Sequence, residues 1–171
     1  MESISCVVEK LDSDVWGYHI VIPSDIAKQF IEGDNRRVVC HINDSLSTQS
    51  ALMPIKGYYM ILINKQVRDK LGLRLGSTVQ IKLEKDKSKY GLPMPESFET
   101  LLAQDDEGRT YFEALTMGKQ RALIHLVGKV KNIDSQLNKG LAIMDHLKES
   151  NGKLDFKRLN EIIKMYNNGL R

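Results

Sequence analysis

The pair of residues closest to a catalytic arrangement in this chain is Cys40 and His41. A nucleophile needs a base within hydrogen-bond reach. Both residues lie in a predicted strand, where neighbouring side chains point to opposite faces of the sheet, so their adjacency does not bring them together. His19 falls in a different strand-like run. The sequence therefore predicts no catalytic residue and favours a protein without catalytic activity, with an enzyme of unknown reaction as an alternative.

Metal and cofactor sites have equally little support in the sequence. No two histidines stand four residues apart and no Cys-x-x-Cys motif occurs, so a zinc site is not predicted. The run that begins at Asp12 resembles a calcium loop, but Trp16 and Pro23 occupy ligand positions, and Trp16 is expected to pack on the core instead. The acidic run at residues 105–107 is expected to be a solvated turn. We therefore predict no metal and no cofactor.

Basic residues are the remaining candidates for binding nucleic acid or another ligand. Two follow the first predicted helix, two lie on the second helix and one lies in the next loop: Arg36, Arg37, Lys65, Arg68 and Arg74. Interleaved acidic residues would weaken their field, and the whole chain has 25 Lys and Arg against 22 Asp and Glu, a net charge of +3. A dedicated nucleic-acid binder has a stronger basic bias. The sequence therefore predicts only weak binding to nucleic acid.

These candidates lie within a strand–helix–strand pattern that occurs twice, at residues 17–43 and 57–83. An apolar alternation marks the second strand of each copy, through Val38, Cys40 and Ile42 and then through Val79, Ile81 and Leu83. One copy alone has too little apolar surface for a core, so we expect the two copies to close into one barrel. Because the copies share few identities, two unrelated strand–helix–strand units remain the alternative.

The strands of this barrel are predicted from the alternation of apolar and β-branched residues. They cover residues 4–11, 18–22, 37–42, 51–55 and 58–63, followed by a strand through residues 79–83. The polar run at residues 43–49 is predicted to be a connection between strands. Gly76 is predicted to adopt a positive φ at the turn after the second helix.

After the barrel the composition changes and the apolar residues recur at helical spacing. Pro93 and Pro95 indicate a short stiff linker. Helices are predicted at residues 96–103, 110–115, 117–129 and 135–148, and a last helix is capped by Asp155. The predicted fold class is α+β, with a duplicated, double-split β-barrel over residues 1–88, a linker over residues 89–95 and an all-helical domain over residues 96–171.

The repeated pattern resembles the swapped-hairpin barrels of the AbrB type, in which two chains each supply one unit. Residues 4–86 resemble the N-terminal barrel of unknown function found in many bacterial proteins, through Trp16, Pro23, Ile42-Asn43, Lys65, Arg68, Leu71-Gly72-Leu73 and Gly76. Residues 92–148 resemble the YdeI/OmpD-associated family, also called bacteriocin-protection, through Leu92-Pro93, Phe112, Leu115, Lys119-Gln120-Arg121 and Lys129.

The chain departs from these families at three places. Asp44 replaces a glycine after Asn43, Ser77 replaces an aspartate after Gly76, and the arginine-rich stretch expected after Lys129 is missing. A binding role of those arginines is therefore not carried over to this chain.

The resemblance implies a bacterial cytoplasmic protein without settled biochemistry, connected with stress or bacteriocin protection. The leading interpretation is a non-catalytic interaction module with an unknown protein partner. An AbrB-like DNA-binding protein is the first alternative, and a small-molecule-binding protein or an enzyme is the second. Because both barrel halves lie on one chain, we expect a monomer. Cys6 and Cys40 are expected to be free buried thiols, and no apolar run reaches the roughly 18 residues of a membrane span.

Overall fold

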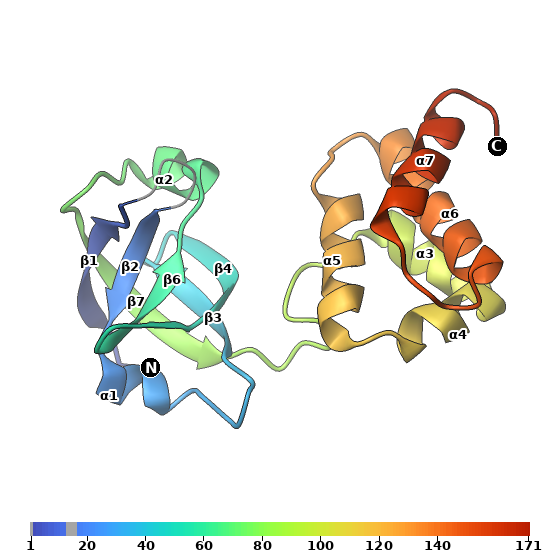
Figure 1. The fold of residues 1–171 in the computed structure, drawn as a ribbon. Coiled ribbons are helices and arrows are strands. Elements are labelled where there is room, and N and C mark those ends of the chain that lie inside the picture. The colour runs from blue at the N-terminus through green and yellow to red at the C-terminus, as the bar shows by residue number, and fades with distance from the viewer. Residues whose placement is uncertain (1, 13–16) are drawn as a thin grey trace. The chain divides into compact units, whose positions relative to one another are not determined.

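Strands build the first part of the chain and helices build the second in the computed structural model, which describes residues 2–12 and 17–171 (Figure 1). The two parts form separate compact units, Met1–Gly91 and Leu92–Arg171. The predicted α+β class is therefore confirmed. Trp16, which we expected on the barrel core, lies outside the described residues.

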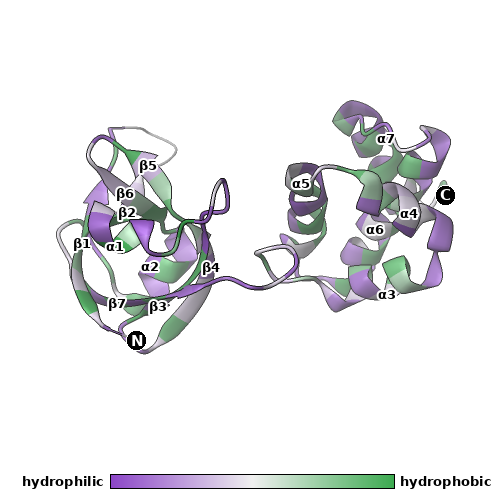
Figure 2. Ribbon diagram, turned by 90° about the horizontal axis from the view of Figure 1, so that it is seen from below, coloured by the Kyte–Doolittle hydropathy of each residue, from purple (hydrophilic) through white to green (hydrophobic). Residues whose placement is uncertain are grey.

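The first unit is a nearly closed antiparallel barrel. Its strands are β1 (Ile4–Lys10), β2 (Tyr18–Ile22), β3 (Arg37–Ile42), β4 (Leu46–Ala51), β5 (Met53–Ile55), β6 (Tyr58–Leu62) and β7 (Thr78–Lys85). They lie in the order β4-β3-β7-β1-β2-β6-β5, and each neighbouring pair is antiparallel. Figure 2 shows hydrophobic and hydrophilic residues alternating along these strands, and the hydrophobic ones fill the interior of the barrel.

Strand β1 takes part in both halves of the barrel. Its first residues pair with β7, where Ile4 lies opposite Ile81, and its last residues pair with β2, where Lys10 lies opposite Tyr18. On the other side of the barrel the equivalent task is divided between β4, which pairs with β3, and β5, which pairs with β6; both precede the second copy in the chain. Strand β2 also pairs with β6 and β3 with β7, so each of these strands meets its counterpart. The doubled sequence pattern is therefore matched by a doubled arrangement of strands.

The prediction of a connection over residues 43–49 is wrong in its second half, because β4 begins at Leu46. Asn43 and Asp44 make the turn, with φ values of 52° and 51°. These two residue types tolerate the left-handed conformation because their short polar side chains form local hydrogen bonds. Residues 47–50 are Ser, Thr, Gln and Ser, so β4 carries no apolar alternation that could indicate a strand.

Both cysteines lie in the barrel interior, as predicted. Cys6 and Cys40 are free and buried. Burial raises the pKa of the Cys6 thiol to about 11 and that of Cys40 to about 12. Thiols held protonated in this way are unreactive, so the two cysteines pack as small apolar residues.

Two short helices lie at opposite ends of the barrel. Helix α1 (Ser24–Lys28) follows β2, and α2 (Lys65–Leu71) follows β6. Because β2 and β6 are antiparallel, the chain leaves them in opposite directions and the helices are carried apart (Figure 1). After α2 the chain turns at Gly76 with a φ of 83°, which confirms the predicted positive φ.

The second unit is a bundle around one long central helix. It consists of α3 (Glu96–Gln104), α4 (Asp106–Ala114), α5 (Met117–Gly128), α6 (Ile133–Glu149) and α7 (Phe156–Asn167). Helix α6 contacts all the others, and the rings of Phe98 and Phe112 meet edge to face with their centroids 5.4 Å apart. Among the described residues, no helix is long and apolar enough to cross a membrane.

The prediction of a solvated turn over residues 105–107 is wrong in its secondary structure, since Asp106 and Glu107 are exposed as expected but belong to a helix. The side chain of Asp105 accepts a hydrogen bond from the backbone N–H of Gly108 and so caps α4, which begins at Asp106. Asp105 also pairs with Lys148 on α6 at 2.7 Å. Acidic residues are favourable in the first turn of a helix, so this acidic run starts a helix.

Candidate functional site

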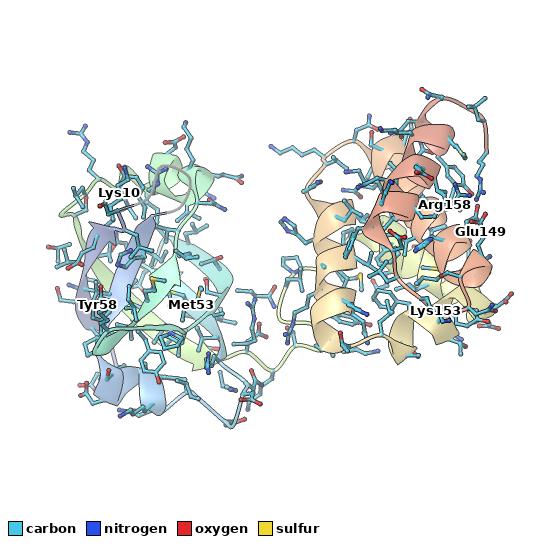
Figure 3. The ribbon with its side chains drawn as sticks, in the orientation of Figure 1. Lys10, Met53, Tyr58, Glu149, Lys153 and Arg158 are labelled. Atoms are coloured by element: carbon cyan, nitrogen blue, oxygen red, sulfur yellow. The ribbon has the colours of Figure 1, made fainter. Side chains whose placement is uncertain are left out.

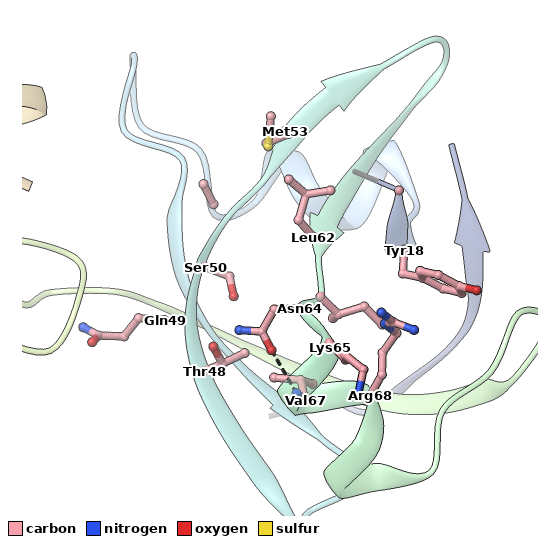
Figure 4. Close-up of a pocket in the computed structure, with 13 residues that line it drawn as sticks. Tyr18, Thr48, Gln49, Ser50, Met53, Leu62, Asn64, Lys65, Val67 and Arg68 are labelled. Atoms are coloured by element: carbon pink, nitrogen blue, oxygen red, sulfur yellow. Dashed lines mark hydrogen bonds between the residues drawn. The ribbon is translucent and has the colours of Figure 1, made fainter. Parts of the chain in front are cut away.

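A cavity of about 480 Å³ opens in the barrel wall between β4 and β6, with α2 at one end (Figure 4). We call it the seam groove. Its described lining residues are Gly17, Tyr18, Thr48, Gln49, Ser50, Ala51, Met53, Leu62, Ile63, Asn64, Lys65, Val67 and Arg68. Small-molecule sites typically have volumes of about 300–1,000 Å³, so this groove has the size of such a site.

The groove exists because the barrel does not close completely. Strand β4 pairs with β3 along one edge, and none of the described strands pairs with its other edge. The N–H of Leu52 donates to the carbonyl of Arg36, which fixes the hydrogen-bonded positions of this strand pair. Such positions alternate in an antiparallel pair, so the backbone groups of Gln49 and Ala51 face the groove. The open edge therefore offers polar backbone groups to a ligand.

Helix α2 is held at the end of the groove by residues that fix its two termini. The side chain of Asn64 accepts a hydrogen bond of 2.9 Å from the N–H of Val67, drawn as a dashed line in Figure 4. Gly72 ends the helix with a left-handed φ of 63°. Along the exposed side of α2, Lys65 pairs with Asp69 at 2.7 Å. The charge of Lys65 is therefore balanced within the helix.

The guanidinium of Arg68 is stacked on the ring of Tyr18. Its central carbon lies 3.8 Å from the ring centroid, and the Lys10 ammonium lies 5.6 Å from the same centroid. Figure 3 shows Lys10 at the barrel end that carries α2. Tyr18 is itself fixed, because its carbonyl accepts the N–H of Ile63 at 3.0 Å. A cation over an aromatic face is attracted by the ring quadrupole, and the planar guanidinium is thereby oriented.

Arg68 has no acidic partner in the described part of the chain. Its Nε is buried and makes no hydrogen bond, and none of the described carboxylates pairs with its guanidinium. A half-buried guanidinium without an anion is uncommon, because burying an uncompensated charge costs free energy. The arrangement is therefore suited to receiving an anion from outside the chain.

On β4, the lining residue Gln49 is held in place by the buried carboxylate of Asp86. The side-chain amide of Gln49 donates to Asp86 at 3.1 Å and to the hydroxyl of Ser88 at 2.9 Å. Burial by itself raises the pKa of Asp86, but hydrogen bonds from Ser88 and Gln49 outweigh this and hold the pKa below its usual range. Asp86 therefore stays ionised and fixes the orientation of Gln49.

The structure places two of the five predicted basic residues in the groove. Lys65 and Arg68 line it, whereas Arg36, Arg37 and Arg74 do not. Arg37 donates a hydrogen bond to the carbonyl of Gly91, and with Arg36 it lies where β3 begins, at the barrel end opposite α2 (Figure 1). The five residues therefore do not form one basic surface.

Sequence reasoning did not single out Tyr18 or the β4 hydroxyls of Thr48 and Ser50. Tyr18 begins a strand in the first copy just as Tyr58 does in the second, so its role is not visible in the local pattern. The groove brings together residues 17–18, 48–51, 53, 62–65, 67 and 68, which lie far apart in the sequence and meet only in the folded barrel.

A hydroxyl, an imidazole and a carboxylate lie in a row on the outer face of the sheet. The Nδ1 of His41 is 2.7 Å from the Ser47 hydroxyl, and its Nε2 is 3.2 Å from the Glu84 carboxylate in a direction that makes no hydrogen bond. His41 and Ser47 are direct cross-strand partners. Cys40 is buried on the opposite face, as predicted. The row therefore acts as a cross-strand network that supports the β3–β4 pair.

The helical unit contains one buried histidine that joins two helices. The Nε2 of His146 on α6 accepts the backbone N–H of Asp155 at 2.9 Å, directly before α7. Burial lowers the pKa of His146 and outweighs the opposing effect of Asp155. The neutral imidazole is therefore the form that holds the start of α7.

Within residues 2–12 and 17–171, no group of three His, Cys, Asp or Glu side chains is placed to hold a metal ion.

The fold and the groove define a class of protein, in which a duplicated barrel with a ligand-sized opening is followed by a helical bundle. Residues 6–83 match the family described as Domain of unknown function (DUF1905), and residues 92–149 match the family described as Bacteriocin-protection, YdeI or OmpD-Associated. These matches confirm the resemblance to the N-terminal barrel of unknown function and to the YdeI/OmpD-associated family. No curated protein and no solved structure gives a significant match to the chain.

Proposed function

We propose that this protein is a non-catalytic binding protein and that the seam groove is its ligand site. The observation that carries this proposal is the guanidinium of Arg68, which is stacked on Tyr18 inside a groove of about 480 Å³ and has no acidic partner among the described residues. A preformed concave site with a few oriented polar groups is the usual form of a small-molecule site.

The lining of the groove favours binding over catalysis. Its described lining residues include no histidine, cysteine, aspartate or glutamate. General acid–base and nucleophilic catalysis mostly use these side chains, with pKa values close to the working pH. Lys65 and Tyr18 are the titratable groups besides Arg68, and Lys65 is paired with Asp69. The groove can therefore hold and orient a ligand but offers little with which to transform it.

The cellular part of the proposal rests on the second matched family, whose name refers to bacteriocin protection. We place the protein in the bacterial cytoplasm, as a monomer that contributes to stress or bacteriocin protection, with the helical unit available to a protein partner. The buried free thiols of Cys6 and Cys40 support a reducing compartment. The monomer is supported by the barrel, in which one chain supplies both copies of the repeated pattern.

A fragment screen by thermal shift on the full chain tests the proposed site. Ser50→Trp places an indole in the groove, whereas Ser5→Trp places the same ring on an exposed strand position outside it. We expect hits that stabilise the wild type and Ser5→Trp but have lost their effect on Ser50→Trp. Hits that stabilise Ser50→Trp equally would place the ligand site elsewhere and contradict the proposal.

A further inference from the structure

We infer that the seam groove selects an organic monoanion, with a carboxylate held by Arg68 and an apolar body lying along β6. This inference rests on the proposed function and specifies its ligand. Arg68 is the residue that decides the charge of the ligand, because the guanidinium is oriented by Tyr18 and has no anionic partner in the described ranges. A planar guanidinium matches the two oxygens of a carboxylate through parallel hydrogen bonds.

The charges around the groove favour one negative charge on the ligand. Lys65 and Arg68 are the charged residues among the described lining. Lys65 is 2.7 Å from Asp69, and together they form a neutral pair on the exposed side of α2. The uncompensated charge in the described lining is therefore the single positive charge of Arg68, since Lys10, whose ammonium lies 5.6 Å from the Tyr18 ring centroid, is outside the lining. A monoanion balances that charge, whereas a phosphate dianion would leave a negative charge in a partly buried site.

The remaining lining offers an apolar surface beside a polar one. Met53, Leu62 and Val67 supply apolar area, and Figure 4 places Met53 and Arg68 at different ends of the groove. Thr48 and Ser50 supply hydroxyl groups along β4. A ligand that reaches from Arg68 towards Met53 would bury apolar atoms while its acidic end stays paired. An amphipathic acid has this shape, and a fully polar anion does not use the apolar wall.

The width of the opening argues against a peptide strand as the ligand. Strands β4 and β6 approach within 8 Å between Cα atoms. Neighbouring strands lie about 4.7–4.9 Å apart, so a strand inserted between two others would need about 9.5 Å. The open edge of β4 is therefore accessible to a small molecule, while strand addition would require the barrel to open.

Titration of ¹⁵N-labelled full-length protein with three matched probes tests the inference. The probes are 3-phenylpropionate, its neutral amide and 2-phenylethyl phosphate. We expect the carboxylate to bind at least about tenfold more tightly than either of the others, with shifts of the groove amides. Arg68→Gln is expected to make the carboxylate and the amide equal. Arg74→Gln, which removes a positive charge outside the groove, is expected to behave as the wild type.

The outcomes separate this inference from the proposed function. If the amide or the phosphate binds the groove as tightly as the carboxylate, the inferred selectivity for a monoanion is wrong, although the groove remains a ligand site. If none of the three probes shifts the groove amides, the inference is overturned, and the fragment screen decides the proposed function independently. Arg68→Lys keeps the charge but loses the planar fork, so a partial loss of carboxylate preference is expected even if the Gln variant does not fold.

Discussion

Arg68 and Tyr18, whose guanidinium carbon and ring centroid lie 3.8 Å apart, come from different copies of the repeated pattern. Tyr18 begins β2 in the first copy, and Arg68 lies on α2 in the second. Since β2 pairs with β6 and α2 follows β6, the contact forms only when both copies are in the barrel. The seam groove is therefore a product of the duplication and belongs to neither copy alone.

The stacking of Arg68 predicts a difference between two substitutions of Tyr18. Tyr18→Phe keeps the ring and is expected to change the free energy of unfolding by less than about 0.5 kcal/mol, whereas Tyr18→Leu loses the cation–π contact and is expected to cost about 1–2 kcal/mol. Urea unfolding of the full chain measures both values. Equal effects of the two substitutions would show that the ring face contributes nothing to stability.

The buried His146 predicts that the helical unit loses stability as the medium becomes mildly acidic. Burial lowers the pKa of His146 in the folded state, while the unfolded chain has an ordinary histidine pKa of about 6.5. Below that value the unfolded state binds a proton that the folded state resists, so the stability present above about pH 6.5 is lost as the pH falls through the folded pKa. Urea midpoints followed by helical circular dichroism between pH 7.5 and 5 measure this loss.

Two variants isolate the contribution of His146. The neutral side chain of His146→Gln can still accept the N–H of Asp155, so we expect a weaker pH dependence in this window. His125→Gln removes an exposed histidine of the same unit and is expected to keep the wild-type dependence. The low pKa values of Asp105 and Glu149 act in the same direction but at more acidic pH. If the urea midpoint of His146→Gln depends on pH as strongly as that of the wild type, this histidine is not the cause of the pH dependence.

Gly76 predicts a stability loss that depends on backbone conformation alone. Its φ is 83°, and open space surrounds the position of an added Cβ, so a substitution meets strain without a clash. Gly76→Val is expected to cost about 1–3 kcal/mol, because a β-branched residue is strained at positive φ. Gly118→Ala, at a helical position with open space and no positive φ, is expected to stabilise by about 0.5–1 kcal/mol. Thermal unfolding that shows a loss of stability for Gly76→Val and a gain for Gly118→Ala would confirm that backbone conformation decides the effect. A loss of stability under about 0.5 kcal/mol for Gly76→Val would contradict it.

The separation of the basic residues predicts no sequence-specific binding to duplex DNA. Non-specific affinity grows with the number of phosphates neutralised, and the five candidate residues lie at two ends of the barrel. We expect weak binding that disappears at physiological salt, measured by fluorescence anisotropy with random and genomic duplexes. Submicromolar binding that survives that salt, and is lost when Arg36, Arg37, Lys65 and Arg68 are changed to Ala, would favour the AbrB-like alternative.

The strands with apolar alternation could be predicted from the sequence, and so could the turns that need special residues. Val38, Cys40 and Ile42 point inward at every second position, and Gly76 has the positive φ expected of it. Strand β4 could not be predicted, since its polar residues 47–50 face partly exposed surroundings and its pairing partner determines its structure. The alternation of apolar residues in the sequence indicates which side of a strand is buried. A strand that is only partly buried on both sides has no such alternation and cannot be recognised from it.

The candidate site was predictable only in part. Lys65 and Arg68 stand out as basic residues on one helix, but nothing near Tyr18 in the sequence indicates that it supports Arg68. The register between β2 and β6 brings these residues together, and register is set by the packing of the whole barrel. The role of Asp105 as a helix cap could not be predicted for a similar reason, because an acidic run is compatible with a turn as well as with the start of a helix.

A ligand site in the seam groove is tested most directly by a map of chemical-shift changes in the full-length protein on addition of 3-phenylpropionate. We expect the largest changes along β4, at residues 48–51, and at the start of α2, at residues 64–68, and we expect them to be strongly reduced in Ser50→Trp. Changes of equal size in Ser50→Trp, or changes concentrated in the helical unit, would contradict a ligand site in the seam groove.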